Sequence, residues 1–198
     1  MSCVFEKIKR GTNNIIIQTS YQYSTLSRIE GHFIDIERKN AYRAEDIDIL
    51  DQYNKDSSPE AMYTSGPLKL GIEIGTQPIG IESGSNGPRV GFTLEGEWKG
   101  KVESVEELNM SLPKGLVLDG EQIGDCKNFE EVQVTEDRNV YAYNEEIEPI
   151  EDYRSFYCKT KVSDFNDIMG ENEISTKYIR VATAYTYQNE ETERITVK

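Results

Sequence analysis

Residues 13–23, NNIIIQTSYQY, decide the class of this fold. Side chains two positions apart lie on the same face of an extended strand. One face of this stretch therefore carries only β-branched and aromatic residues, which suit a half-buried pleated surface: Ile15, Ile17, Thr19, Tyr21 and Tyr23. The alternation predicts a β-strand. A second alternating run over residues 28–36 predicts another strand, and we expect the two to form a hairpin.

Residues 179–187, IRVATAYTY, repeat the same face pattern near the other end of the chain. Internal similarity of this kind has two explanations. In the first, the chain holds tandem sandwich domains, and residues 1 to about 36 are the last hairpin of one domain or an element that docks beside the next. In the second, the likeness is chance, because alternating strands draw on the same few residue types.

From Pro67 onward, short alternating runs are separated by turn residues such as those of 83–88, SGSNGP. Turn signals recur roughly every 8–15 residues, a spacing typical of an all-β sandwich. Residues 44–53 are the best helix candidate, and the polar residues 55–66 predict a linker or a long loop. The sequence does not show the alternation of strands with helices that is typical of a nucleotide-binding α/β fold.

The expected fold is therefore mainly β, with an Ig-like antiparallel β-sandwich over residues 66–198. Residues 1–65 are expected to be an N-terminal accessory region, with a strand hairpin and a short helix, or the tail of a preceding sandwich domain. A chain of 198 residues is long enough to bury a sizeable core.

The net charge of −14 constrains the partners of the chain. A phosphate backbone is repelled by such a surface, and the densest basic cluster is only Lys7, Lys9 and Arg10. We therefore expect no nucleic-acid partner, and anionic membrane surfaces are disfavoured for the same reason. No apolar run reaches the ~18 residues of a transmembrane helix, so we expect no membrane insertion.

The three cysteines are Cys3, Cys126 and Cys158. Cys126 and Cys158 lie beside strand-like segments of the same half of the chain, which favours a disulfide between them and leaves Cys3 over. The alternative is three reduced, buried thiols. Zinc is not expected, because no Cys-x-x-Cys pair occurs and His32 is the sole histidine.

A set of strand motifs resembles the Ig-like modules found near the C-terminal ends of archaeal cell-surface and secreted proteins. The motifs are PLKLGIEI at 67–74, QPI at 77–79, EWKGKV at 97–102, LNMSLPKGL at 108–116, FYC at 156–158 and YIRVATAYTY at 178–187. The resemblance covers residues 66–198. It implies an extracytoplasmic β-sandwich with a Cys-linked core, and no enzymatic activity. The first residues carry no signal-peptide core, so we expect an extracellular or cell-surface fragment of a longer chain, or a cytoplasmic protein if Met1 is the natural start.

Catalytic motifs are not found in the sequence. Nucleophilic catalysis needs a nucleophile oriented by a base, and the chain has no Gly-x-Ser-x-Gly elbow and no Walker or Gly-x-Gly-x-x-Gly loop. We therefore expect no enzyme and no cofactor, with calcium as the one ion to consider.

Several residues are candidates for binding. Glu145, Glu146, Glu148 and Asp152 form an acidic cluster that offers hard oxygen ligands for calcium, or simply a solvated charged loop. Asn109 begins a glycosylation sequon. Trp98 and the tyrosines suit either a sugar-stacking platform or, as we expect of Trp98, the core or the edge of a sandwich. Exposed strand edges are the general means of strand-addition assembly.

We expect a non-enzymatic cell-surface or secreted module for adhesion or structural assembly, acting on a protein partner or on itself. The alternatives are a carbohydrate- or calcium-binding module, or an intracellular or viral structural subunit.

Overall fold

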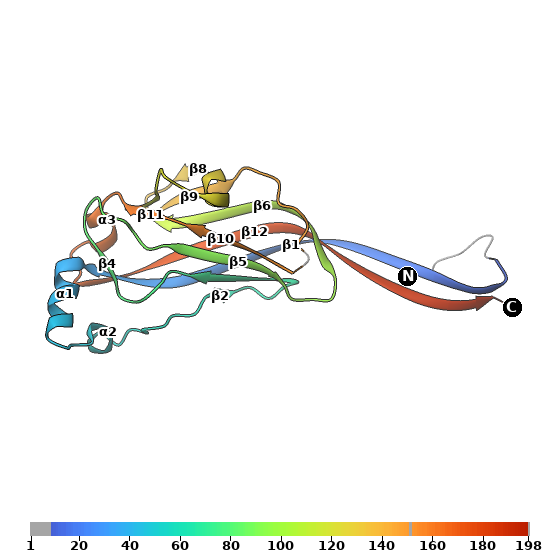
Figure 1. Ribbon diagram of the computed structural model, residues 1–198, viewed down its shortest axis with the longest axis horizontal. Coiled ribbons are helices and arrows are strands. Elements are labelled where there is room, and N and C mark those ends of the chain that lie inside the picture. The colour runs from blue at the N-terminus through green and yellow to red at the C-terminus, as the bar shows by residue number, and fades with distance from the viewer. Residues whose placement is uncertain (1–8, 151, 198) are drawn as a thin grey trace.

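Two long antiparallel strands run through the computed structural model, which describes residues 9–150 and 152–197 (Figure 1). Strand β1 spans Gly11–Asp35 and strand β12 spans Ile174–Val197. They pair in one unbroken register, from Gly11 opposite Val197 to Ile34 opposite Ile174. The first and last strands of the fold therefore form its longest pairing.

The expected hairpin over residues 13–36 is wrong, because both runs belong to β1. Residues 24–27, STLS, contain no Gly, Pro, Asn or Asp that would favour a turn. They also keep the alternation, since Thr25 and Ser27 are buried while Leu26 is exposed. Because the same face is apolar before this segment and buried after it, one continuous strand satisfies both runs.

The two similar segments of sequence lie on neighbouring strands of one sheet, and they face each other over residues 21–23 and 185–187. Tyr21 lies opposite Tyr187, and Ile29 lies opposite Ile179. Neighbouring antiparallel strands bury the same face, which gives them the same alternation. The division of the chain at residues 65 and 66 stays a prediction, although Ile29 of β1 packs in one core with strands of the second part.

The described residues form three sheets, the largest of which contains β1 and β12, and nearly all the strand pairings are antiparallel. The largest has the order β2-β1-β12-β6-β9-β8, with β4 added parallel to β1; the others are β10-β5-β3 and β11-β7. The strands are β2 (Met62–Tyr63), β3 (Leu68–Glu73), β4 (Ile79–Ile81), β5 (Val90–Gly96), β6 (Lys101–Pro113), β7 (Leu116–Leu118), β8 (Phe129–Val134), β9 (Arg138–Tyr143), β10 (Tyr153–Cys158) and β11 (Thr160–Val162). The predicted mainly-β, antiparallel character is confirmed.

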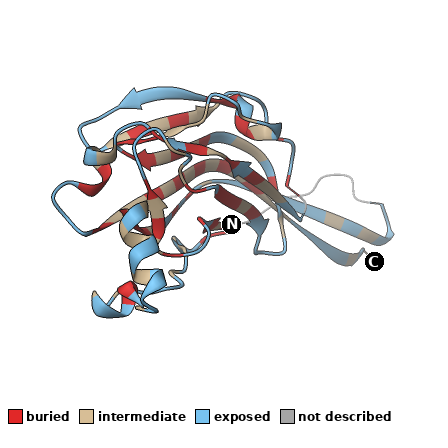
Figure 2. Cartoon of the chain, turned by 60° about the vertical axis from the view of Figure 1, so that its left-hand side comes forward, coloured by how far each residue is buried: buried red, intermediate tan, exposed pale blue. Residues whose placement is uncertain are grey.

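The core lies between these sheets and follows the alternation of the sequence (Figure 2). Leu68 and Leu70 of β3 are fully buried, as are Met110 and Leu112 of β6. The rings of Phe92 and Phe156 stack across β5 and β10 with centroids 4.7 Å apart, beyond which Phe129 packs edge-on. Aromatic and aliphatic side chains from the separate sheets thus form one cluster.

The helices are short. They are α1 (Ile36–Ala44), α2 (Ile49–Gln52) and α3 (Phe165–Met169), with a 3-10 turn at Gly124–Asn128. The helix predicted over 44–53 is realised only as α2, because Asp46 adopts a positive φ of 56° and Asp48 then caps a new helix. None of the described helices is both long and apolar enough to cross a membrane.

The predicted disulfide is confirmed: Cys126 and Cys158 are bonded, with Cα atoms 5.3 Å apart. The bond is buried and joins the 3-10 turn to the end of β10. Cys3 lies outside the described residues. The bond is an internal brace between two segments 32 residues apart.

Replacing both Cys126 and Cys158 with alanine should lower the free energy of unfolding by about 3–4 kcal/mol, because a loop of this length is no longer closed in the unfolded chain. Urea unfolding with and without dithiothreitol measures the effect. The unreplaced protein should lose stability on reduction, whereas the variant should not respond. Equal midpoints for both proteins in both buffers would contradict the assignment.

Candidate functional site

A two-stranded ribbon projects from the body of the molecule (Figure 1). The pairing of β6 with β12 ends where Lys101 lies opposite Gln188. On the other side, β2 pairs with β1 only at Ser27 and Arg28. Among the residues that the structure describes, residues 11–24 of β1 therefore pair only with β12, and residues 189–197 of β12 pair only with β1. These two segments are called the ribbon below.

The ribbon exposes apolar side chains on both faces. Ile17 is 48% exposed and Tyr21 is 51% exposed on the face that continues the core, while Ile16 is 61% exposed on the other face. Figure 2 shows how the burial of the body gives way to exposure along the ribbon. A lone two-stranded ribbon is marginally stable in water. A ribbon of this length with exposed isoleucines is a surface suited to a partner.

The two edges of the ribbon differ in charge. Residues 11–27 of the β1 edge contain no charged side chain, and this is the longest uncharged run in the chain. The β12 edge carries Glu190, Glu191, Glu193 and Arg194. Charged side chains on an edge strand oppose pairing with another chain. The β12 edge is protected in this way, and the β1 edge is not.

Contacts at the root of the ribbon show which backbone groups point outward from β1. The Thr64 backbone N–H donates to the Leu26 carbonyl over 2.9 Å, and the Leu26 N–H donates to Thr64 Oγ1 over 3.1 Å. The outward groups of an antiparallel strand recur at every second residue. They are therefore the N–H and C=O of the even-numbered residues Thr12, Asn14, Ile16, Gln18, Ser20, Gln22 and Ser24. No backbone hydrogen bond to this edge is found from the described part of the chain.

An aromatic cluster holds the root of the ribbon. The ring of Tyr23 packs edge-on against Trp98 at 5.9 Å and lies nearly parallel to Tyr185 at 6.1 Å. Trp98 also packs edge-on against Tyr187. Trp98 lies on the loop between β5 and β6 and is 47% exposed, so it sits at the margin of the core rather than inside it.

Gly100 lets this loop approach the ribbon. Its backbone N–H donates to the hydroxyl of Tyr187 over 2.6 Å. A Cβ atom at this position would collide with the Gln188 backbone carbonyl and the Tyr187 hydroxyl. The close contact therefore depends on a residue without a side chain.

Three of the four predicted metal ligands surround a cleft of about 970 Å³. Glu146, Glu148 and Asp152 line it together with Asp125, Pro149, Ile150, Tyr153 and Arg154, whereas Glu145 does not. Asp125 is already paired with Arg154 over 3.1 Å. In residues 9–150 and 152–197, no three acidic, His or Cys side chains converge as metal ligands would. The calcium site stays a prediction.

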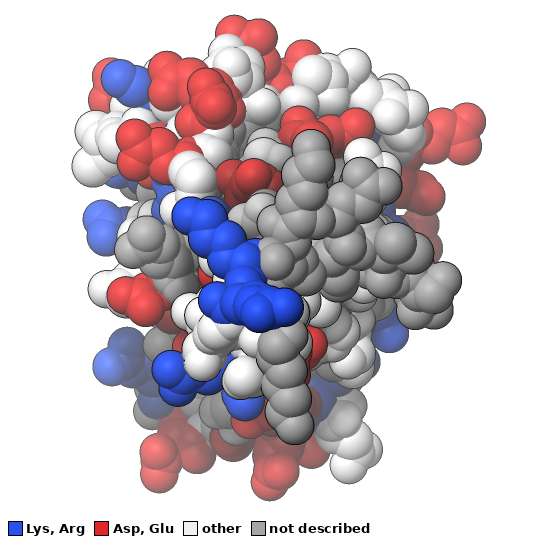
Figure 3. All heavy atoms as spheres, turned by 90° about the vertical axis from the view of Figure 1, so that its right-hand side faces the viewer, with Lys and Arg blue, Asp and Glu red and all other residues white. Residues whose placement is uncertain are grey.

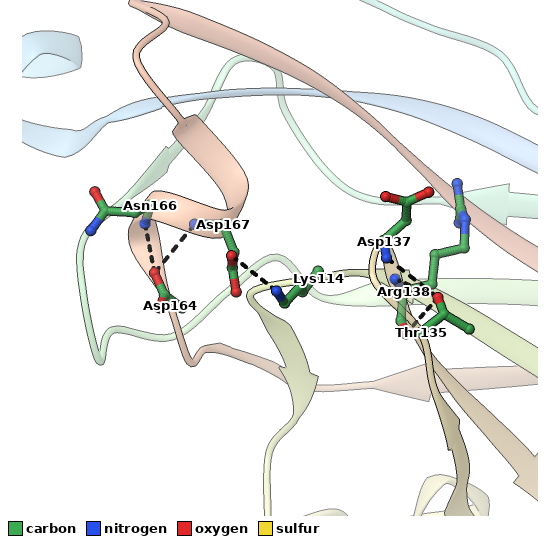
Figure 4. Close-up of polar contacts among 7 residues, drawn as sticks. All are labelled: Lys114, Thr135, Asp137, Arg138, Asp164, Asn166 and Asp167. Atoms are coloured by element: carbon green, nitrogen blue, oxygen red, sulfur yellow. Dashed lines mark hydrogen bonds and ion pairs between the residues drawn. The ribbon is translucent and has the colours of Figure 1, made fainter.

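A second polar cluster braces the turns near α3 (Figure 4). The Asp164 carboxylate accepts from the backbone N–H of Asn166 over 2.8 Å, and Lys114 pairs with Asp167 over 3.4 Å. Thr135 Oγ1 accepts from the Arg138 N–H over 3.0 Å. These contacts cap a helix and close a turn, and the residues drawn include no nucleophile paired with a base. Their role is structural.

His32 is almost fully buried in β1. Its Nδ1 lies 3.1 Å from Thr176 Oγ1, while its Nε2 has no partner among the described residues. Burial, and to a lesser degree the charge of Lys55, lowers the pKa of His32 below its ordinary value. Its imidazole is therefore a neutral packing residue.

The predicted glycosylation residue, Asn109, lies within β6 between Ala142 of β9 and Ala182 of β12. It is half-buried on the face away from Leu108 and Met110. Its modification stays a prediction.

No protein-family model matches the sequence, and a search of curated proteins finds no match. The resemblance to archaeal Ig-like modules stays a prediction. The candidate site is therefore defined by its geometry, which consists of the ribbon, its uncharged edge and its aromatic root.

Replacing Gly100 with alanine should loosen the root of the ribbon, because the new methyl group cannot fit against the Gln188 carbonyl. Trp98 is the only tryptophan, so its fluorescence should shift to longer wavelength as it leaves the tyrosine cluster. Gly120→Ala is the matched control, since nothing lies within 4 Å of a Cβ there. Identical emission from both variants and the parent protein would refute the role of Gly100.

Stability should fall as the pH drops below about 6.5, because the unfolded chain then binds a proton that folded His32 binds less readily. Because the pKa of His32 is lowered in the folded protein, its contribution to stability is fully present at pH values above the pKa of the unfolded chain. That contribution is lost at lower pH. Urea unfolding at several pH values between 7 and 5 should show a steeper loss for the parent than for His32→Asn. Parallel curves would show that His32 does not titrate as stated.

Proposed function

We propose that this chain is a non-enzymatic structural module that assembles with a partner by strand addition along the β1 edge of the ribbon. In strand addition, an extended segment pairs with an open sheet edge through main-chain hydrogen bonds. The outward backbone groups of residues 12–24 offer such an edge, and the side chains there are uncharged. This edge is the observation that carries the proposal.

The other edges of the largest sheet support this choice. The edge strand β8 carries Glu130 and Glu131, and its register shifts between Glu131 and Gln133. The opposite edge strand, β2, is only two residues long. Charges, bulges and short strands are the usual means of blocking an edge. The β1 edge of the ribbon has none of the three.

Two features favour a module outside the reducing cytosol. The buried Cys126–Cys158 bond is of a kind that persists in oxidising compartments. Antiparallel sheets that share one core are compatible with the Ig-like sandwich that the strand motifs resemble. We therefore propose an Ig-like, cell-surface or secreted module for adhesion or assembly.

A carbohydrate-binding module is the second candidate, on one observation. Trp98 and Tyr21 expose about half of their surface at the ribbon root, where Tyr23 bridges them. Exposed aromatic rings can pack against apolar faces of a ligand. Binding of soluble glycans that is lost in Trp98→Ala but kept in ribbon-edge variants would favour this candidate.

The assembly proposal is tested with a defined strand, a capped and fluorescein-labelled peptide of residues 11–25. The peptide should raise its fluorescence anisotropy on binding the full chain at low protein concentration. Gln18→Pro should weaken binding at least about tenfold, because proline removes an outward N–H without removing a hydrogen bond to β12. Gln18→Ala, which keeps the N–H, should bind as the parent does.

Circular dichroism should confirm that both Gln18 variants are folded. A peptide that fails to bind the parent, or that binds Gln18→Pro as tightly as the parent, would overturn the assignment of the β1 edge.

A further inference from the structure

We propose that the strand added to the β1 edge is β1 of a second copy of this chain, running antiparallel about a two-fold axis at Gln18. This inference rests on the proposed function and names its partner. It follows from the extent of the free edge, the charge of the molecule and the side chains on each face.

The extent of the edge sets the register. Pairing cannot continue past Ser24, because the Leu26 backbone groups are already bonded to Thr64 and β2 follows. At the other end, β1 begins at Gly11, so the first outward groups belong to Thr12. A two-fold axis at Gln18, midway between Thr12 and Ser24, pairs every outward N–H and C=O with the second copy. If the two β1 strands shift by one residue pair, outward N–H and C=O groups at the ends of the pairing are left without a partner.

The charge of the molecule favours this surface for self-association. Two copies carry −14 each and repel over most of their surfaces. Residues 11–27 form the longest stretch along which two copies approach without placing like charges opposite each other. An interface between identical chains about a two-fold axis must be complementary to itself, and an uncharged strand meets that condition.

The tip of the ribbon is basic. Lys9, Arg10 and Arg194 lie near its tip, and Figure 3 shows Lys and Arg side chains near the centre of the view from this end, with Asp and Glu further out. In this register, Gly11 of each copy lies opposite Thr25 of the other, and the next charged side chain of β1 beyond Thr25 is Arg28. The pairing therefore relies on the uncharged residues between the ends of the ribbon.

The side chains also match across the two-fold axis. On the face that continues the core, Ile15 lies opposite Tyr21 of the second copy and Ile17 lies opposite Thr19 of the second copy. Cross-strand pairs of aromatic and β-branched residues stabilise antiparallel sheets. On the other face, Gln18 meets its own counterpart, and Ile16 lies opposite Ser20 of the second copy among otherwise polar side chains. The half-exposed Ile17 and Tyr21 each gain a neighbouring side chain from the second copy.

The test places opposite charges at Gln18, the residue on the two-fold axis, in the full chain. Sedimentation velocity over a range of protein concentrations measures the dimer dissociation constant of each variant. The parent protein should dimerise. Gln18→Lys and Gln18→Glu should each raise the dimer dissociation constant by roughly five- to tenfold, because each places two like charges opposite one another. A one-to-one mixture of the two variants should recover the parent affinity as a heterodimer.

Thr192→Lys and Thr192→Glu are the matched controls, because Thr192 is exposed on the β12 edge of the ribbon opposite Ile16. They should leave dimerisation unchanged. A cysteine at Gln18, in a Cys3→Ser background, should cross-link two copies, since paired strands bring their Cα atoms to within disulfide range. A cysteine at Thr192 should not.

The possible results separate this inference from the proposed function. If the parent stays monomeric while the peptide of residues 11–25 still binds and Gln18→Pro still blocks it, strand addition stands and the second copy is excluded. If a mixture of the Lys and Glu variants does not recover, the register at Gln18 is wrong. If neither the peptide nor a second copy binds, both proposals fail.

Discussion

The pairing of β1 with β12 is the constraint on which the rest of the structure depends. It joins the two ends of the chain in one register from Gly11 to Ile34, and it places β1 between β12 and the short strands β2 and β4 in the largest sheet. In the body, this pair is supported by β6, by β2 and β4, and by the core that the other sheets cover. In the ribbon, the same pair has no such support among the described residues. One interaction therefore produces both a buried core and an exposed projection.

The distribution of charge then decides how the projection can be used. An acidic chain keeps its surface apart from other copies, and its charges are spread along β12 and β8 as they are over the body. The β1 edge is the exception, with seventeen consecutive uncharged positions over residues 11–27. A neutral edge is a liability unless a partner covers it, which is the physical basis of the assembly proposal. At the aromatic root, Trp98 and Gly100 of the loop before β6 contact Tyr187 and so attach the base of the ribbon to the body.

Individual residues show why some features were predictable and others were not. The alternation from Ile15 to Tyr23 predicts a strand, because period two is a local property of extended backbone. The pairing of Cys126 with Cys158 was predicted from the position of both beside strands. The join between the two halves of β1 was missed, although Thr25 and Ser27 keep the parity of the alternation and no turn residue separates them. The expectation that Trp98 lies in the core or at the edge of a sandwich left its exact position open, because that position depends on a contact between the loop before β6 and the distant Tyr23.

The sequence by itself determined the alternation of the strands, which face of each strand is apolar and how acidic the surface is, and it favoured the disulfide that the structure contains. These are local properties of side-chain type and spacing. Only the tertiary structure decided that the two similar segments lie on neighbouring strands, that β6 and β2 stop short of the ribbon, and that Ile17 and Tyr21 are exposed. Alternation assigns a side chain to a face of its strand, but long-range pairing determines whether that face and that edge are covered.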